Sequence, residues 1–328
     1  MMSLTRRATA MCVLVLVTAG TAWAADESPA AARVRFDRND EKGELTIRID
    51  GKDALVYKYH KDQDMPYYFP VRSPSGRPMT IEFPTQFPHH RSFYFADRVK
   101  LEGRKDDLNF YGSLYAKKDP KDASKGYKYQ IRHLEFVPVK GQVDQPILRT
   151  KIGWLLGEDT AVLEETRSVR VVALGEGEYF LDMTFTLTAA TGDVTFTSDW
   201  VHYAWPFVRM DPAYSVQQGG KMVNSEGGEN QKGTNGKDAK WVDYSGTIEG
   251  KTEGLTLMSH SDNEHPHWWL TRDYGTFGPR RIGAKSGKPF TLKKGQSITT
   301  RCGALVHKGD VKEGKVAQRY RQYVEGKL

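Results

Sequence analysis

The stretch YFLDMTFTLTA, residues 179–189, carries the pattern that decides the fold class. Its large apolar side chains occupy alternate positions, and polar side chains fill most of the positions between them. Successive side chains of a strand point to opposite faces, so this period of two predicts an antiparallel strand with one face on the core. The expected core face consists of Tyr179, Leu181, Met183, Phe185 and Leu187.

Similar alternation recurs along the chain, and turn-forming residues separate the segments. A helical period occurs only near the end, where Val316, Tyr320, Tyr323 and Val324 share one face of a predicted amphipathic helix. Many strands without alternating helices predict an all-β fold, a large antiparallel β-sandwich with one C-terminal helix. A mutarotase-like supersandwich is one form of it that stays open. Further expected strands are 44–50, 78–83, 147–156, 162–174 and 297–306.

Residues 1–24 have the pattern of a cleavable export signal. Arg6 and Arg7 precede a short apolar run at 10–17, and Ala-Trp-Ala at 22–24 forms a small-x-small cleavage site. The run is shorter than the roughly 20 residues that a membrane span needs. We therefore expect a periplasmic or extracellular protein without integral membrane insertion.

The mature chain is expected to have a disordered start at 25–31 and a single domain at 32–328. Loss of Arg6 and Arg7 takes the net charge from +7 to +5, and the charges are interspersed. This distribution predicts no nucleic-acid partner. Cys302 is then the only cysteine, so no internal disulfide forms. The oligomeric state does not follow from the sequence.

Histidine, arginine and aromatic residues gather in a few segments. The segment 88–98 contains His89, His90 and Arg91, and 265–275 contains a second group of this kind. Alternation back from Phe93 and Phe95 would place His89 and Arg91 on the core face, which is costly unless they line a wet pocket. We expect the two segments to meet across one pocket, with a buried arginine held by Asp273, Asp199 or Glu226.

Two long connections, 100–128 and 224–240, interrupt the strands. The first contains several aromatic residues, which favours an ordered structure, whereas the second is rich in Gly and Asn and would suit a lid. The chain has no glycine-rich phosphate loop, no nucleophile elbow and no dinucleotide fingerprint, so no cofactor is predicted. His265 and His267 are two residues apart, but a turn at Pro266 is the preferred interpretation, and no metal site is predicted.

Several ordered motifs are similar to those of a family of secreted bacterial proteins, the PmoA-like family, also labelled methane oxygenase PmoA. The resemblance covers about 66–284 and the C-terminal helix. It implies a protein that accompanies polysaccharide-degrading and sugar-oxidising enzymes. The motifs are YYFPVRSPSGRPMT at 67–80, PHHRSFYFA at 88–96, GGKMVNSEG at 219–227, AKWVDYSG at 239–246, GKTEGLTLMSH at 250–260 and HPHWWLTRDYGTF at 265–277.

The chain departs from this family at one segment. SDWVHYAWPF, residues 198–207, stands where the family has a short Lys-Glu-Gly segment. If that glutamate is catalytic in the family, His202 or Asp199 would have to replace it here. Methane oxidation is rejected, because no apolar run of 18 or more residues follows the export signal.

The residue pattern suits a carbohydrate-active protein, and the family resemblance implies a glycan or an oxidised sugar as substrate. Acid and base groups suit a glycoside hydrolase or a lyase, and tryptophans suit stacking on sugar rings. The alternative is a non-catalytic sugar-binding or scaffold module. The predicted catalytic residues are His90, His202, Glu226 and Arg272. The predicted substrate-binding residues are His89, Arg91, Trp205, His267, Trp268 and Asp273.

Overall fold

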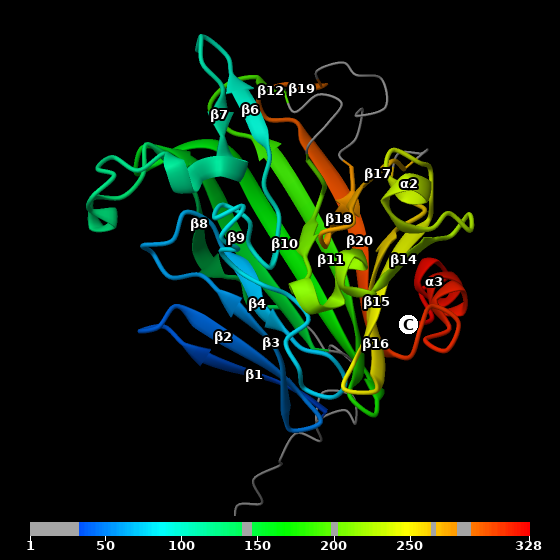
Figure 1. The fold of residues 1–328 in the computed structure, drawn as a ribbon. Helices are drawn as coiled ribbons and strands as arrows, with labels where there is room; N and C mark the ends of the chain where they lie inside the picture. The colour runs from blue at the N-terminus through cyan, green and yellow to red at the C-terminus, as the bar shows by residue number, and fades with distance from the viewer. Residues whose placement is uncertain (1–32, 140–145, 198–202, 264–266, 281–289) are drawn as a thin grey trace, which may run out of the picture.

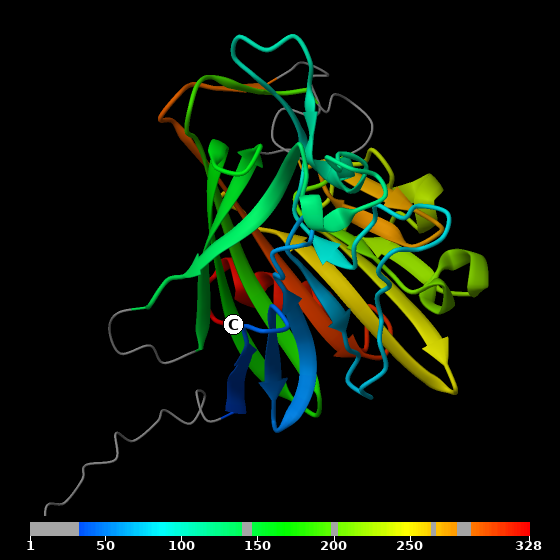
Figure 2. The ribbon, with the colours of Figure 1, turned by 90° about the vertical axis from the view of Figure 1, so that its left-hand side faces the viewer.

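The computed structural model describes residues 33–139, 146–197, 203–263, 267–280 and 290–328. The predicted export signal and residues 25–31 lie outside them. Two eight-stranded antiparallel sheets pack face to face, and a four-stranded sheet stands at one end (Figures 1 and 2). The predicted antiparallel β-sandwich is therefore confirmed. No helix among the described residues is long and apolar enough to cross a membrane.

The first sheet has the order β1 (Val34–Asn39), β2 (Glu44–Ile49), β3 (Lys52–Lys58), β4 (Tyr67–Val71), β5 (Phe93–Tyr94), β13 (Phe207–Arg209), β18 (Thr276–Pro279) and β17 (Trp269–Arg272). The second has the order β14 (Lys221–Asn224), β15 (Trp241–Ile248), β16 (Lys251–Ser259), β20 (Ser297–Lys308), β11 (Glu178–Ala189), β10 (Thr160–Gly175), β9 (Ile147–Leu156) and β8 (Tyr129–Phe136). The third contains β19 (Phe290–Leu292), β12 (Val194–Phe196), β6 (Arg98–Leu101) and β7 (Leu108–Asn109).

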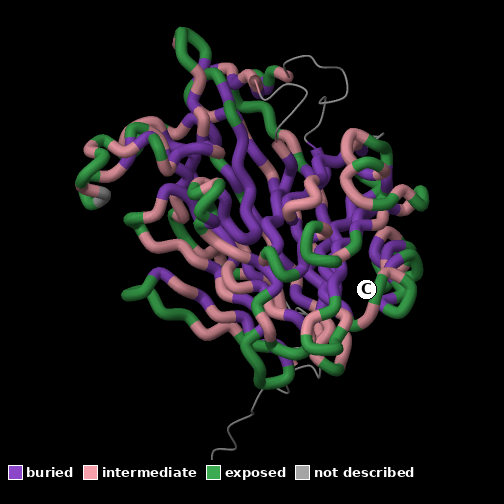
Figure 3. The backbone as a smooth tube through the Cα atoms, viewed as in Figure 1, coloured by how far each residue is buried: buried purple, intermediate pink, exposed green. Residues whose placement is uncertain are grey.

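Aromatic side chains from the two large sheets meet in one core. The ring of Phe95, directly after β5, stacks on Phe185 of β11 with centroids 4.5 Å apart. The ring of Phe277 in β18 lies 5.5 Å from Tyr244 in β15. All five apolar residues of the expected core face of β11 are buried, as the alternation predicted. Figure 3 shows the buried backbone in the middle of the sheets and the exposed turns at their ends.

The predicted C-terminal helix is present as α3 (Val316–Val324) and packs on the outer face of the second sheet. Tyr323 lies with its ring centroid 5.0 Å from that of Phe180 in β11. The alternation of β11 therefore buries both faces here, one against the first sheet and one against the helix. The buried members of this outer cluster are Phe180, Trp241, Met258, Leu305, Val316, Tyr320, Tyr323 and Leu328.

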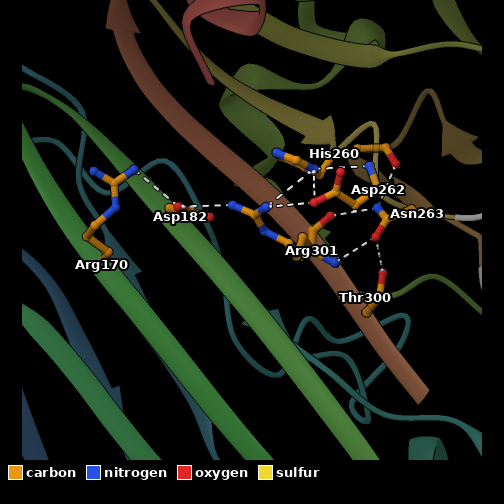
Figure 4. Close-up of polar contacts among 8 residues, drawn as sticks. Arg170, Asp182, His260, Asp262, Asn263, Thr300 and Arg301 are labelled. Carbon is orange, nitrogen blue, oxygen red and sulfur yellow. Dashed lines mark hydrogen bonds and ion pairs between the residues drawn. The ribbon is translucent and has the colours of Figure 1, made fainter. Parts of the chain in front are cut away.

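A chain of charged side chains crosses the same outer face (Figure 4). Asp182 on β11 pairs with Arg170 on β10 at 3.1 Å and with Arg301 on β20 at 3.6 Å. Arg301 also pairs with Asp262 at 3.0 Å, in the turn after β16, and His260 lies beside that pair. These contacts link three neighbouring strands to the turn that follows β16.

The strand expected at 78–83 does not form. Only two isolated bridges occur there, from Pro78 to Arg72 and from Thr80 to Met210, and Phe83 adopts a positive φ of 53° that ends the extended backbone. The apolar residues of this segment indicated a strand, but the strands beside β4 are β3 and β5, so no position in the first sheet is left for it.

The two long connections are both structured. Residues 100–128 contain β7 and the short 3-10 helices Phe110–Tyr115 and Ala123–Lys125, in line with the expectation of order. Residues 224–240 contain α2 (Asn230–Thr234), which packs on β17. The hydroxyl of Thr234 lies 2.7 Å from that of Thr271, and both side chains are buried. This docking argues against the lid that the composition suggested. Two further 3-10 helices are Pro212–Tyr214 and Val216–Gln218.

Candidate functional site

A pocket of about 260 Å³ opens on the outer face of the first sheet. It brings together the loop 84–92, the 3-10 helix 110–115, and strands β17 and β18, which are far apart in the sequence. Both segments that were expected to meet contribute to its wall. The lining residues are Phe87, His89, His90, Tyr111, Tyr203, Leu270, Arg272, Tyr274 and Thr276.

Strand alternation explains why polar residues reach this face. Val208 in β13 pairs with Phe277 in β18, and the Phe277 ring points into the sandwich toward Tyr244. The next pair along these strands, Arg209 with Thr276, therefore points away from the core. Thr276 pairs in turn with Arg272 of β17. Arg209, Thr276 and Arg272 thus form one row across three strands on the outer face.

His90 forms a buried part of the pocket wall. Its Nε2 lies 2.7 Å from the Tyr111 hydroxyl, and its ring stacks on Phe87 with centroids 4.8 Å apart. Burial, followed by the charges of His89 and Arg209, lowers the pKa of His90 to about 3. The ring is therefore neutral at physiological pH. Its Nδ1 is buried and has no hydrogen-bond partner.

His89 is more exposed than His90 and lies at the edge of the pocket. Its Nδ1 is 3.2 Å from the Tyr115 hydroxyl. Partial burial is the main reason that the pKa of His89 is lowered, and the charge of Arg91 adds to this. A neutral imidazole at the edge of a pocket can accept a proton from a bound molecule.

Arg91 is fully buried behind this loop and does not line the pocket. Its guanidinium donates to the Asp64 carboxylate and, at 3.0 Å, to the carbonyl of Pro88. Asp64 also accepts from the Ser113 hydroxyl at 3.0 Å. The expectation that Asp273, Asp199 or Glu226 holds this arginine was wrong. The expected alternation also fails, because β5 covers only Phe93–Tyr94 and the preceding residues form turns.

Arg272 lines the same pocket as the two histidines. Its Nη1 donates to the Asn235 side-chain oxygen at 2.8 Å and to the Thr271 carbonyl at 2.9 Å. Asn235 follows α2 directly, so the docked 224–240 connection orients the arginine. The expected carboxylate partner is replaced by an amide, and no described carboxylate forms an ion pair with Arg272.

Arg209 was not predicted as a site residue. Its side chain is 4% exposed, and its guanidinium carbon lies 4.6 Å from the centroid of the Tyr274 ring, which lines the pocket. One Nη donates to the Tyr274 carbonyl, whereas the buried Nε has no partner. Burial lowers the pKa of Arg209, and the groups that oppose this shift are tyrosines. The sequence signal was an arginine at the end of a short apolar strand.

Trp205, predicted to stack on a sugar, is 1% exposed and belongs to the core. Its indole nitrogen donates to Asp97 at 2.7 Å, and its ring packs against Phe95 and Phe196. A ring without exposed area cannot be a stacking platform, so this assignment was wrong. The aromatic pattern of 198–207 did not distinguish a core tryptophan from a surface one.

Glu226 and Asp273 also lie outside the pocket lining. Glu226 is exposed on the turn after β14, where its amide nitrogen donates to the Asn224 side chain at 3.1 Å. The backbone nitrogen of Gln231, in the first turn of α2, donates to the Asp273 carboxylate at 2.8 Å. Asp273 therefore holds α2 on the sheet. The predicted convergence of these carboxylates with His90 was wrong.

Two further predicted residues, His267 and Trp268, do not line the pocket. His267 is buried, and Trp268 is half-buried with the Arg280 guanidinium 5.8 Å from its ring. Its neighbour Trp269 is fully buried, so the two tryptophans point to opposite faces, as expected for a strand. His202 lies outside the described residues, as do Asp199 and the 265–266 dipeptide.

Among the described residues, no three or more His, Cys, Asp or Glu side chains form a group that could hold a metal ion. Cys302 is fully buried on β20, as expected for a small core residue. Burial raises the pKa of its thiol well above the usual range, which disfavours the reactive thiolate.

Residues 44–321 match the Family of unknown function (DUF6807). The chain belongs to this family. The matched residues include every residue of the pocket lining, so the pocket lies within the family domain. No curated protein matches the sequence of this DUF6807 member.

Solved structures with similar folds include two glycoside-cleaving enzymes and a lyase. A GH36 alpha-galactosidase from Geobacillus stearothermophilus matches 85% of this chain and 42% of its own, at 10% identity and a TM-score of 0.45. An alpha-galactosidase from Lactobacillus brevis matches 85% and 40%, at 8% identity and a TM-score of 0.43. A polysaccharide lyase matches 87% and 34%, at 12% identity and a TM-score of 0.36. This DUF6807 chain thus spans less than half the length of these proteins, and its function is argued from its own pocket.

Proposed function

We propose that this protein is an exported carbohydrate-active enzyme that binds one sugar unit of a glycan in the pocket and cleaves the adjoining bond. The observation that supports this is the mixture of groups in the wall. Rings of Phe87, Tyr111, Tyr203 and Tyr274 offer apolar faces, and His89, Arg272 and Thr276 offer hydrogen bonds. A volume of about 260 Å³ suits a single sugar ring, since pockets for larger ligands span ~300–1,000 Å³.

The two histidines and Tyr111 are the proposed chemical groups. Burial is the main cause that raises the pKa of Tyr111, so the phenol keeps its proton. With the His90 proton on Nε2, that ring donates to the phenol oxygen, and the hydroxyl hydrogen of Tyr111 is free to point into the pocket. Tyr111 is then the general acid, His90 positions it, and His89 is the general base.

Of the two cleavage reactions, the wall favours a lyase over a hydrolase. Glycoside hydrolysis usually requires a pair of carboxylic acids on either side of the bond. None of the described residues that line the pocket is Asp or Glu. An elimination needs only a base and an acid, and both are present at His89 and Tyr111.

A screen of polysaccharides with the purified mature protein tests this proposal. We expect a product with a new carbon–carbon double bond, detected by ultraviolet absorbance, from at least one glycan. Tyr111→Phe should lower kcat by about 10²–10⁴-fold, the usual contribution of a general acid, with a smaller change in KM. Glu226→Gln, on an exposed turn outside the wall, is the matched control and should keep full activity.

Three outcomes would contradict the proposal. New reducing ends without unsaturated product would indicate hydrolysis. Binding of a glycan without any product would indicate the non-catalytic module. An activity that survives Tyr111→Phe but is lost in Glu226→Gln would place the chemistry elsewhere on the molecule.

A further inference from the structure

Two arginines in one row of the first sheet, on β13 and β17, have no carboxylate partner among the described residues. Arg209 and Arg272 are separated by Thr276 in the row across β13, β18 and β17. Neither forms an ion pair with any carboxylate of the residues that the structure describes. A third positive charge, that of Arg280, lies near Arg272, which helps to lower the pKa of Arg280 after the larger effect of burial. The neighbouring Asp273 carboxylate is engaged by the backbone nitrogen of Gln231.

Burial of Arg209 makes this excess of positive charge costly. An arginine that is 4% exposed has lost most of its hydration, and buried charges are normally paired. The ring of Tyr274 and one carbonyl compensate only in part, because Nε remains without a partner. An anion in the pocket would supply the missing charge.

Arg272 is oriented to bind such an anion. Its Nη1 is engaged by Asn235 and by its own strand, which fixes the plane of the guanidinium. Its Nε and Nη2 donate to no described residue. These two groups form the edge that pairs with the two oxygens of a carboxylate, an arrangement that gives short, strong hydrogen bonds.

We propose that the sugar unit bound in this pocket is acidic, with a carboxylate held by Arg272 in the positive field of Arg209. The substrate class is then a glycan that contains uronic acid residues. This inference rests on the proposed function, and it adds the identity of the group that the arginines recognise.

An acidic sugar also completes the elimination. The neutral His89 ring takes the proton from the carbon next to the carboxylate, and the arginine stabilises the negative charge that develops on that group. The electrons of the broken C–H bond form a carbon–carbon double bond, and the C–O bond to the neighbouring sugar breaks. Tyr111 gives its proton to the leaving oxygen. The products are an unsaturated acidic sugar and an alcohol, and neither water nor an oxidant is consumed.

Binding measurements on the full mature protein test the acidic subsite. The probes are D-glucuronic acid, its uncharged methyl ester and D-galacturonic acid, each followed by ligand-detected proton NMR, and sodium sulfate, tested as a competitor that displaces the bound acid. We expect at least one acid to bind about tenfold or more tightly than the methyl ester, the usual size of a charge-assisted contact. Arg272→Gln should remove this preference, and Arg272→Lys should restore part of it because the charge returns without the planar edge.

The outcomes separate this inference from the proposed function. Equal binding of acid and ester, or an unchanged preference in Arg272→Gln, would overturn the acidic subsite while sugar binding stands. Sulfate that binds as tightly as the acids would indicate a general anion site and also overturn it. Arg209→Gln provides a second variant, in which the preference for the acid over the methyl ester should also fall. Thermal unfolding of each variant shows whether the fold is retained.

Discussion

At the scale of single residues, the ion pair between Arg91 and Asp64 explains how the pocket wall is held in place. Arg91 belongs to the loop that contains His89 and His90, whereas Asp64 also binds Ser113 in the 3-10 helix that contains Tyr111. One buried carboxylate thus joins both sides of the histidine–tyrosine contact. The cost of burying two charges is offset because each forms several hydrogen bonds.

Asp64→Asn should destabilise the fold strongly. It leaves the Arg91 guanidinium buried without a counter-charge, and the expected loss in the free energy of unfolding is about 3–5 kcal/mol. Denaturant unfolding measures this directly. Asp53→Asn is the control, because its pair with Arg48 is 45% and 44% exposed and should contribute less than about 1 kcal/mol. Similar losses in both variants would contradict a special role for Asp64.

Only those residues of the candidate site could be predicted from the sequence whose residue type alone indicates a functional role. His89, His90 and Arg272 stand in segments dense in histidine and arginine, and the structure places all three at one pocket. Arg209 and Tyr203 carry no such signal, because their place depends on how β13 lies between β5 and β18. Trp205 was misassigned for the same reason, since burial of a ring is decided by distant strands.

At the scale of elements, regular alternation in the sequence predicted the long strands reliably. It did not predict the short, irregular strands. Four strands were expected within a few residues of their observed bounds, because each is long and lies within the second sheet: β9, β10, β11 and β20. β5 and β13 span two and three residues, too few for a period to emerge. Their pairing is fixed by tertiary contacts instead.

The C-terminal helix offers a test at this scale. Tyr323→Ala removes a ring that packs on Phe180 and leaves a cavity between α3 and the sheet. We expect a loss of about 3–5 kcal/mol in the free energy of unfolding, the range for large aromatic residues. Gln318→Ala on the exposed face of the same helix should change it by less than about 0.5 kcal/mol. Equal effects would show that the helix is not docked as described.

At the scale of the whole molecule, buried histidines set a pH range of maximal stability. Burial lowers the pKa of His90 to about 3 and that of His133 to about 4. His307 differs: burial opposes its charge, but the Asp243 carboxylate 2.8 Å away outweighs this and raises its pKa. Its second nitrogen lies 3.0 Å from the Lys308 carbonyl, so both nitrogens face acceptors.

The free energy of unfolding should therefore be greatest near pH ~6.5, the ordinary pKa of histidine. Below it, His90 and His133 bind protons more readily in the unfolded chain, so stability falls as the pH drops toward 3. Above it, the stabilisation from His307 is lost as the pH rises through the raised pKa, by at most about 1.4 kcal/mol per pH unit. Denaturant unfolding across pH measures both limbs. His307→Gln should flatten the alkaline limb alone, and an unchanged limb would contradict this assignment.

The position of β20 has a consequence for the order in which the molecule assembles. This strand, residues 297–308, lies in the middle of the second sheet between β16 and β11, so its two neighbours end about 40 and 110 residues earlier in the chain. Until it is synthesised, β16 and β11 have no partner on their inner edges and expose backbone groups that pair readily with other chains. Folding of the sheet is thereby deferred until synthesis is nearly finished, and a chain that stops before residue 297 is expected to aggregate rather than to form a smaller sandwich.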